Sequence, residues 1–132
     1  PWAKWQPNAG FSKAEPWLPM PRGWDSLAVD AQDGSPGSML FFYQQVLALR
    51  RRIAGMLPHH ITWLPAPNGV LVLERGRLTV AVNFLAGPVE LQLTGRLLIA
   101  TQPLARYRKG LRTLPANTGA WLQNGRLPGG FL

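Results

Sequence analysis

Val70-Leu71-Val72-Leu73-Glu74 and Leu78-Thr79-Val80-Ala81-Val82-Asn83-Phe84 are the two stretches that decide the fold of this chain. Apolar and polar residues alternate along the second stretch with a period of two, which is the period of a β-strand. A turn at Arg75-Gly76 separates the stretches, so the sequence predicts an antiparallel hairpin. We expect one face of the second strand to be apolar and the other mixed. The apolar face would hold Leu78, Val80, Val82 and Phe84, and the mixed face Thr79, Ala81 and Asn83.

Short strands also recur on both sides of this hairpin. Before it, Ile61 to Leu64 leads into a turn at Asn68-Gly69, a pair that favours hairpins because both residues accept positive φ. After it, we expect strands along Val89 to Leu93, Leu97 to Thr101 and, beyond a loop rich in basic residues and proline, Gly119 to Leu122. The spacing predicts an antiparallel meander. A sheet that is apolar on one face must fold over into a sandwich or lean on a neighbour.

A single long helix is predicted ahead of the strands, over residues 35–54. Ser35 would cap it, and Pro36 suits the first helical position because its missing N–H needs no partner there. Apolar residues follow the helical spacing on one face and also occur outside that stripe, which indicates two packing partners. The triplet Arg50-Arg51-Arg52 falls in the last turn, where cations offset the helix dipole.

Residues 1–34 fit neither a helix nor a regular sheet. They hold five prolines and four tryptophans, and an irregular loop cannot bury four indole rings against itself. We therefore expect another body beneath this loop. The resulting fold class is mainly β with one long helix: an irregular N-terminal loop, the helix, and an antiparallel, sandwich-like C-terminal domain.

Composition places further bounds on the chain. It has 132 residues, which are too few for a β/α barrel of about 250, and it has no cysteine for a disulfide or a thiolate metal site. The net charge of +8 raises the possibility of an anionic partner. However, the basic residues are scattered apart from Arg50-Arg51-Arg52 and Arg106-Tyr107-Arg108-Lys109, so nucleic acid is not the favoured partner. No segment has the length and apolarity of a membrane span.

Several segments resemble, in their order, the C-terminal third of the α-glucosidases and oligo-1,6-glucosidases of glycoside hydrolase family 13. Asn8-Ala9-Gly10-Phe11-Ser12 and Glu15-Pro16-Trp17-Leu18-Pro19 are similar to the loop that follows the last barrel strand. Asp33 to Arg51 is similar to the last barrel helix. Gly69 to Arg75, Val82-Asn83-Phe84 and Leu114 to Ala120 are similar to strands of the all-β C-terminal domain.

The resemblance implies a division into residues 1–57, a part of the catalytic barrel with its loop and helix, residues 58–123, the β-domain, and residues 124–132, a flexible tail. It implies that the partner is the rest of the barrel, and that the substrate, an α-glucoside or malto-oligosaccharide, reaches this chain through the parent enzyme. Trp2 and Phe11 are the expected contacts at the substrate rim. The first residue, Pro1, fits a piece of a longer chain, and we expect a cytoplasmic protein.

No catalytic, cofactor-binding or metal-binding residue is predicted. Retaining hydrolysis of a glycosidic bond needs two carboxyl groups about 5 Å apart, and the six acidic residues are dispersed along the chain. His59-His60 lacks a third ligand nearby in sequence. The chain alone is therefore expected to be inactive. The alternatives that remain open are a small basic nucleic-acid-binding module and a carbohydrate-binding module that uses its tryptophans.

Overall fold

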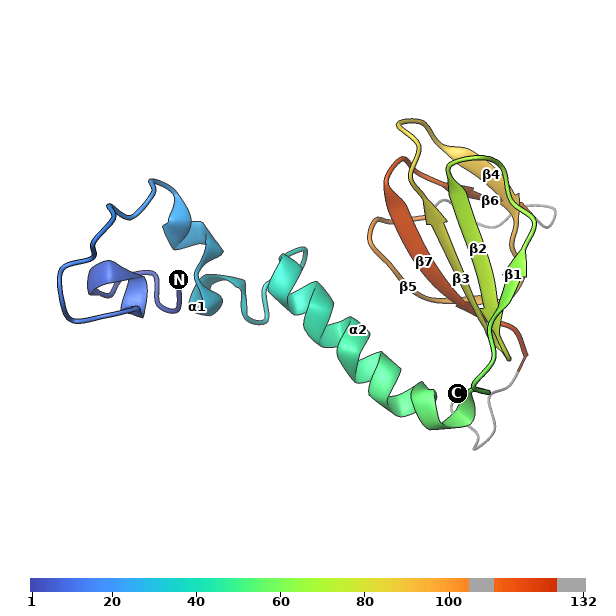
Figure 1. Cartoon of the computed structure of the whole chain (residues 1–132), viewed down its shortest axis with the longest axis horizontal. Helices are drawn as coiled ribbons and strands as arrows, with labels where there is room; N and C mark the ends of the chain where they lie inside the picture. The colour runs from blue at the N-terminus through green and yellow to red at the C-terminus, as the bar shows by residue number, and fades with distance from the viewer. Residues whose placement is uncertain (105–110, 126–132) are drawn as a thin grey trace. The chain divides into compact units, whose positions relative to one another are not determined.

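The structure is a computed structural model that describes residues 1–104 and 111–125. It divides into two compact units, Pro1–Leu49 and Arg50–Leu132. The predicted fold class is confirmed: the chain has one long helix followed by antiparallel strands (Figure 1). The division at residues 57 and 58 stays a prediction. Of the predicted tail, residues 124–132, the structure describes residues 124 and 125, and residues 126–132 lie outside the described range.

The N-terminal unit is irregular, as predicted, but it contains single helical turns. These are the 3₁₀ turns η1 (Pro7–Gly10) and η2 (Trp24–Leu27) and the one-turn helix α1 (Val29–Gln32). This unit has almost no interior, because its buried apolar residues are two alanines, Ala9 and Ala28. Two small methyl groups cannot provide a hydrophobic core for the tryptophans around them.

The long helix, α2 (Met39–Ile53), begins later than predicted. Ser38 caps it in place of Ser35: its hydroxyl oxygen accepts a hydrogen bond from the backbone N–H of Phe41 at 3.1 Å and its hydroxyl donates to the Gln32 carbonyl at 2.6 Å. Gly37 has a φ of +86°, a left-handed conformation that a helix cannot contain. The helix therefore starts after Gly37, and the first of the two serines is left in a turn.

In the described part of the second unit, seven strands form two sheets (Figure 1). The larger sheet has the order β1-β2-β3-β7-β5, the smaller one pairs β4 with β6, and every pairing is antiparallel. The strands are β1 (Thr62–Leu64), β2 (Val70–Arg75), β3 (Leu78–Asn83), β4 (Val89–Gln92), β5 (Arg96–Ala100), β6 (Leu111–Leu114) and β7 (Thr118–Gln123).

The predicted meander is wrong beyond the third strand. β3 pairs with β7 and not with β4, so the chain leaves the larger sheet after β3 and returns to it with β5. The segment before the last strand, predicted to be a loop, contains β6, which supplies the partner of β4. The predicted cluster Arg106-Tyr107-Arg108-Lys109 in that segment lies outside the described residues.

The core lies between the two sheets, on the face of β3 that carries its smaller side chains. Register places Leu64, Val72, Ala81, Ala120 and Ala100 in one row across the five strands. This inner face packs with residues of the β4–β6 side into one cluster. The buried members of the cluster are Val72, Ala81, Leu91, Leu93, Leu114, Ala120 and Leu122.

The opposite side of the larger sheet, which we call the outer face, is also apolar. Its central row is Trp63, Leu73, Val80, Trp121 and Ile99, one residue from each strand. None of these five residues belongs to the core cluster or packs against it, and all of them keep some exposure. The sequence was therefore right about which side chains of β3 share a face. The core, however, lies on the other face.

Asn83 is the polar anchor of the core. Its side chain has no solvent exposure, and its amide nitrogen lies 2.9 Å from the Gly87 carbonyl, 3.2 Å from that of Leu114 and 2.9 Å from that of Pro115. Its side-chain oxygen accepts a hydrogen bond from the backbone N–H of Leu85 at 2.9 Å. One buried amide thus joins the end of β3 to the loop that follows it and to the end of β6.

Replacing this amide should destabilise the β-domain. In Asn83→Ala, buried carbonyl groups and one N–H group lose their partner, so we expect the free energy of unfolding to fall by about 2–3 kcal/mol. Urea denaturation of the whole chain, followed by far-UV circular dichroism, measures the change. Gln92→Ala, an exposed amide on β4, is the control and should shift stability by less than about 0.5 kcal/mol. Equal effects of the two substitutions would contradict the anchoring role.

Candidate functional site

The N-terminal loop that carries the predicted rim residues is closed by backbone hydrogen bonds. The N–H groups of Trp2 and Ala3 both donate to the Ala9 carbonyl, at 2.8 and 3.1 Å. The start of α1 bonds to the same segment, since Val29 donates to the Pro1 carbonyl and Asp30 to that of Trp2. These contacts hold Trp2 in a defined position although its side chain stays exposed.

The turn Pro7–Gly10 has an uncommon conformation. Asn8, Ala9 and Gly10 have φ values of +53°, +51° and +76°, so three consecutive residues are left-handed. This region costs energy for residues with a Cβ atom, and such conformations concentrate at functional positions. Only glycine fits the third position comfortably, because a Cβ atom there would lie 3.3 Å from the backbone nitrogen of Ala3.

Asn8 compensates for this strain by binding the segment that follows. Its side-chain amide donates to the carbonyl of Ser12 at 3.0 Å and to that of Ala14 at 2.7 Å. The Ser12 hydroxyl accepts a hydrogen bond from the N–H of Ala14 at 2.9 Å. In sequence, Phe11 stands between Asn8 and the two residues whose carbonyl groups Asn8 binds. The Asn8 side chain therefore fixes the backbone of the segment that carries Phe11.

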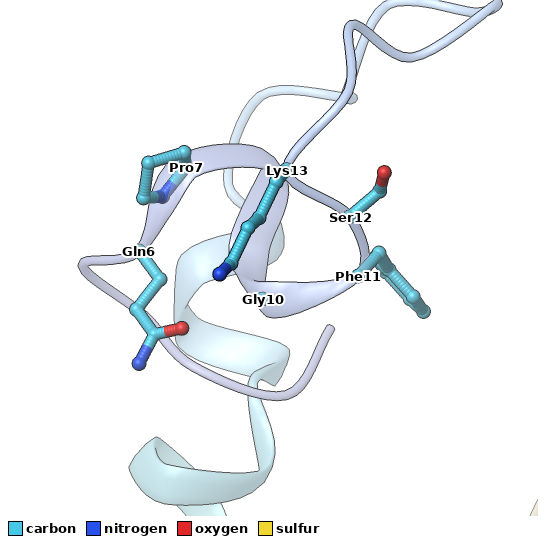
Figure 2. A pocket seen from close by; sticks show the side chains of 6 residues that line it. All are labelled: Gln6, Pro7, Gly10, Phe11, Ser12 and Lys13. Atoms are coloured by element: carbon cyan, nitrogen blue, oxygen red, sulfur yellow. The ribbon is translucent and has the colours of Figure 1, made fainter.

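A recess of about 490 Å³ lies beside this turn. It is lined by Gln6, Pro7, Gly10, Phe11, Ser12 and Lys13 (Figure 2). Figure 2 shows the side chains of Gln6 and Lys13 extending to the same side of the loop, while the Phe11 ring extends away from them. The recess thus offers an amide and an ammonium group on one side, and an exposed aromatic ring lies on the other.

The structure brings only one of the two predicted rim residues to this recess. Phe11 lines it, whereas Trp2 does not. Gln6 and Lys13 were not singled out in the sequence. The signal for them was the run Pro7-Asn8-Ala9-Gly10, because a turn of this composition brings the residues on its two sides together.

The described acidic side chains have structural partners or stand on the surface. The Asp30 carboxylate accepts hydrogen bonds from the Lys4 N–H at 3.0 and 2.9 Å, and Asp33 accepts one from the Gln44 amide at 2.9 Å. Glu74 accepts hydrogen bonds from Thr79 and Asn124. Its neighbours are thus a hydroxyl and an amide, whereas a hydrolytic centre needs a second carboxyl group.

Metal binding finds no support in the described part of the chain. Across residues 1–104 and 111–125, no three histidine, cysteine, aspartate or glutamate side chains gather as a metal site requires. His59 and His60 are exposed. Among the described helices, none has the length and apolarity needed to cross a membrane.

Comparison with known proteins finds relatives of part of this chain among the α-glucosidases. No family model matches the chain. A probable α-glucosidase of Rhizobium meliloti (strain 1021) is 44% identical over 65 residues, which are 49% of this chain and 12% of that protein. The probable oligo-1,6-glucosidase 2 of Bacillus subtilis (strain 168) is 32% identical over 50 residues, 38% of this chain and 9% of that protein.

The fold agrees with these relatives. A solved variant of trehalose-6-phosphate hydrolase from Bacillus licheniformis matches 94% of this chain and 25% of its own length, with a TM-score of 0.73 and 19% identity. The chain is similar to part of the family 13 α-glucosidases. The resemblance found in the sequence is thereby confirmed. The β-domain has the fold of the C-terminal β-domain in this family, and the chain spans about a tenth of the length of the curated relatives it matches.

The role of Asn8 in this loop can be tested by limited proteolysis. Asn8→Asp retains a residue type that tolerates left-handed φ but replaces the amide donor with an acceptor that faces two carbonyl oxygens. The loss of these hydrogen bonds should open the turn, so we expect trypsin to cleave after Lys13 about tenfold faster. Mass spectrometry of timed digests of the whole chain measures this rate.

Asn68→Asp, in the Asn68-Gly69 turn before β2, is the matched control. It makes the same chemical change in an exposed loop of the other unit. It should leave cleavage after Lys13 unaltered. Unchanged cleavage in Asn8→Asp would show that Asn8 does not hold the turn.

Proposed function

We propose that this chain is the non-catalytic C-terminal part of an α-glucosidase-type glycosidase and that it supports a catalytic β/α barrel. In this proposal the N-terminal unit belongs to the barrel: its loop borders the active-site mouth and α2 is the last barrel helix. The β-domain then stabilises the barrel from outside. The homology to α-glucosidases supports the enzyme class.

The observation that carries the structural role is the exposure of the N-terminal unit. Trp17 is 95% exposed, Trp5 83% and Trp2 62%, while the buried apolar residues of the unit are two alanines. Large apolar side chains stabilise a fold only when another surface removes them from water, by about 25 cal/mol per Å². A surface of this kind marks an interface, and under the proposal the rest of the barrel covers it.

The long helix supports the same arrangement. Met39, Tyr43 and Leu47 follow each other at intervals of four residues and are all exposed. Phe42 and Val46 lie beside this row and Phe41 lies on the opposite side of the helix, and all three are only partly buried. A helix that is apolar on most of its circumference belongs in the interior of a larger protein, and the last helix of a barrel, packed between strands and neighbouring helices, has such surroundings.

Catalysis is assigned to residues outside this chain. Hydrolysis of a glycosidic bond needs an acid and a nucleophile or base on opposite sides of the bond. The described acidic groups bind backbone amides, hydroxyl groups and side-chain amides, or stand alone on the surface. The absence of cysteine agrees with a cytoplasmic enzyme, which is the compartment we propose.

The recess around Phe11 is proposed as part of the substrate rim, together with Trp2. Both side chains are exposed on a loop that hydrogen bonds hold in place. Aromatic rings present a flat apolar surface to one face of a sugar ring, while the Lys13 ammonium and the Gln6 amide can bind hydroxyl groups. The proposed ligand is the α-glucoside or malto-oligosaccharide of the parent enzyme.

The purified chain should not hydrolyse sugars. We expect no release of p-nitrophenol from p-nitrophenyl α-glucoside and no glucose from maltose, above the rate of a mock purification. A whole α-glucosidase serves as the positive control. Turnover that co-purifies with the chain, and that is lost on changing one of its own acidic residues, would contradict the proposal.

The rim can be tested in a chimera in which this chain replaces the matched region of the Rhizobium meliloti relative. Phe11→Ala should raise KM by about three- to tenfold and leave kcat nearly unchanged, because a stacking contact at the mouth stabilises bound substrate and transition state alike. Leu111→Ala, a similarly exposed apolar residue on β6, is the control and should leave both constants unaltered. Unchanged KM in Phe11→Ala would remove Phe11 from the rim.

A further inference from the structure

The recess beside the turn Pro7–Gly10 contains a positive charge that the chain does not balance. Of the six residues that line it, Lys13 alone is charged, and its side chain is exposed. Among the described residues, no carboxylate forms an ion pair with the Lys13 ammonium. The recess has a volume of about 490 Å³, which lies within the range of about 300–1,000 Å³ for small-molecule sites.

The acidic groups of the same unit stand outside the recess. The unit Pro1–Leu49 has four of them, and none is a lining residue. Asp30 and Asp33 accept hydrogen bonds from amide groups of this unit. Asp25 lies in the first turn of η2, and Glu15 is exposed just beyond Lys13 in sequence. The charge inside the recess is therefore positive.

Gln6 adds a neutral hydrogen-bonding group next to this charge. Figure 2 shows the side chains of Gln6 and Lys13 extending to the same side of the loop. A side-chain amide can donate two hydrogen bonds and an ammonium three, and the ammonium cannot accept any. Two donor groups that converge on one recess are suited to an oxygen atom of a ligand, and most of all to a charged oxygen.

The turn holds the backbone of both residues. The Gln6 carbonyl accepts the Ala9 N–H at 3.0 Å. The Asn8 amide donates to the carbonyls of Ser12 and Ala14, the two residues that flank Lys13 in sequence. Because the backbone at both positions is fixed before a ligand arrives, less ordering remains to be done on binding.

The charge of Lys13 decides which ligand the recess favours. A ligand that fills the recess removes water from the ammonium group. A neutral hydroxyl group returns a hydrogen bond to it, whereas a carboxylate or phosphate also compensates its charge. Between two ligands of the same shape, the recess therefore discriminates in favour of the anionic one.

We propose that this recess accepts an anionic group, a carboxylate or a phosphate, on the aglycone of an α-glucoside, the part of the substrate that leaves on hydrolysis. Lys13 is the charge partner of this group and Gln6 its second donor. The proposal rests on the proposed function, in which the loop borders the active-site mouth of the parent enzyme. It narrows the substrate class and makes Lys13 a specificity-determining residue.

The test uses the chimera with the Rhizobium meliloti relative and two substrates of nearly equal shape. Maltobionate carries a carboxylate on its aglycone, and maltitol carries a hydroxymethyl group at the same position. Lys13→Gln should lower the ratio of kcat/KM for maltobionate to that for maltitol about three- to fivefold, the size expected for a solvent-exposed ion pair. The change should come from the KM for maltobionate, with maltitol nearly unaffected.

Arg22→Gln is the matched control. It removes one positive charge from an exposed position of the same unit outside the recess, so the ratio should stay unchanged. High salt should weaken the preference of the wild-type chimera for maltobionate, because exposed charges are screened. Phe11→Ala should raise KM for both substrates alike, since its ring contact does not depend on charge.

A second pair of compounds identifies the anion. Glucose 6-phosphate and glucose are compared as inhibitors of the chimera and of its Lys13→Gln variant. Stronger inhibition by glucose 6-phosphate that Lys13→Gln abolishes would assign the recess to phosphate as well. A Lys13-dependent preference for maltobionate alone would assign it to carboxylates.

The outcomes separate the inference from the proposed function. An active chimera whose substrate ratio is the same with and without Lys13→Gln overturns the inference and leaves the proposed function intact. An equal loss for both substrates in Lys13→Gln overturns it too, because Lys13 would then serve neutral sugars or the shape of the loop. An equal change of the ratio in Arg22→Gln would assign the preference to the general charge of the unit and likewise overturn it. A wild-type chimera without activity counts against the proposed function and removes the basis of the inference.

Discussion

The structure depends on one constraint: the five-stranded sheet is apolar on both faces, and the described residues bury one face much more completely than the other. The β4–β6 pair and its flanking residues close the inner face around Ala81 and Ala120. The outer face keeps two tryptophans and several aliphatic side chains in partial contact with water. A two-layer sandwich normally alternates buried and polar residues along each strand. The apolar residues on the second face of this sheet depart from that alternation.

This constraint explains which part of the sequence-based prediction failed. Alternation along β3 correctly separated Leu78, Val80 and Val82 from Thr79, Ala81 and Asn83, because side-chain direction follows from backbone geometry. Which set faces the core is a tertiary property. The small side chains at Ala81 and Ala120 allow the second sheet to approach closely, and Thr79 and Asn83 tolerate burial because their polar groups are hydrogen-bonded. Hydrophobicity alone points to the opposite face.

The other differences between prediction and structure have local or topological causes. Helix α2 starts at Met39 because the left-handed Gly37 interrupts the chain and makes Ser38 the cap, a choice between two serines that composition cannot make. β6 was missed because its four residues alternate poorly and gain their strand conformation from pairing with β4. The strands with clear alternation and turn residues, β2 and β3 above all, were predicted nearly to their ends. In the candidate site, Phe11 was predicted, but Gln6 and Lys13 depend on a turn whose left-handed residues only the structure reveals.

The two units depend on a partner in different ways, and this difference follows from where each keeps its apolar surface. The β-domain has its own core, closed by Asn83 and by the pairing of seven strands, so a partner adds to a fold that already exists. The N-terminal unit has hydrogen bonds that fix its loop but almost no buried apolar area, since Ala9 and Ala28 are its interior. Because a hydrogen bond contributes only about 1 kcal/mol net, such a loop keeps its shape chiefly when a larger body covers its indole rings. The β-domain is therefore the self-sufficient part of the chain, and the loop that presents Phe11 is the part whose order would depend most on the proposed barrel.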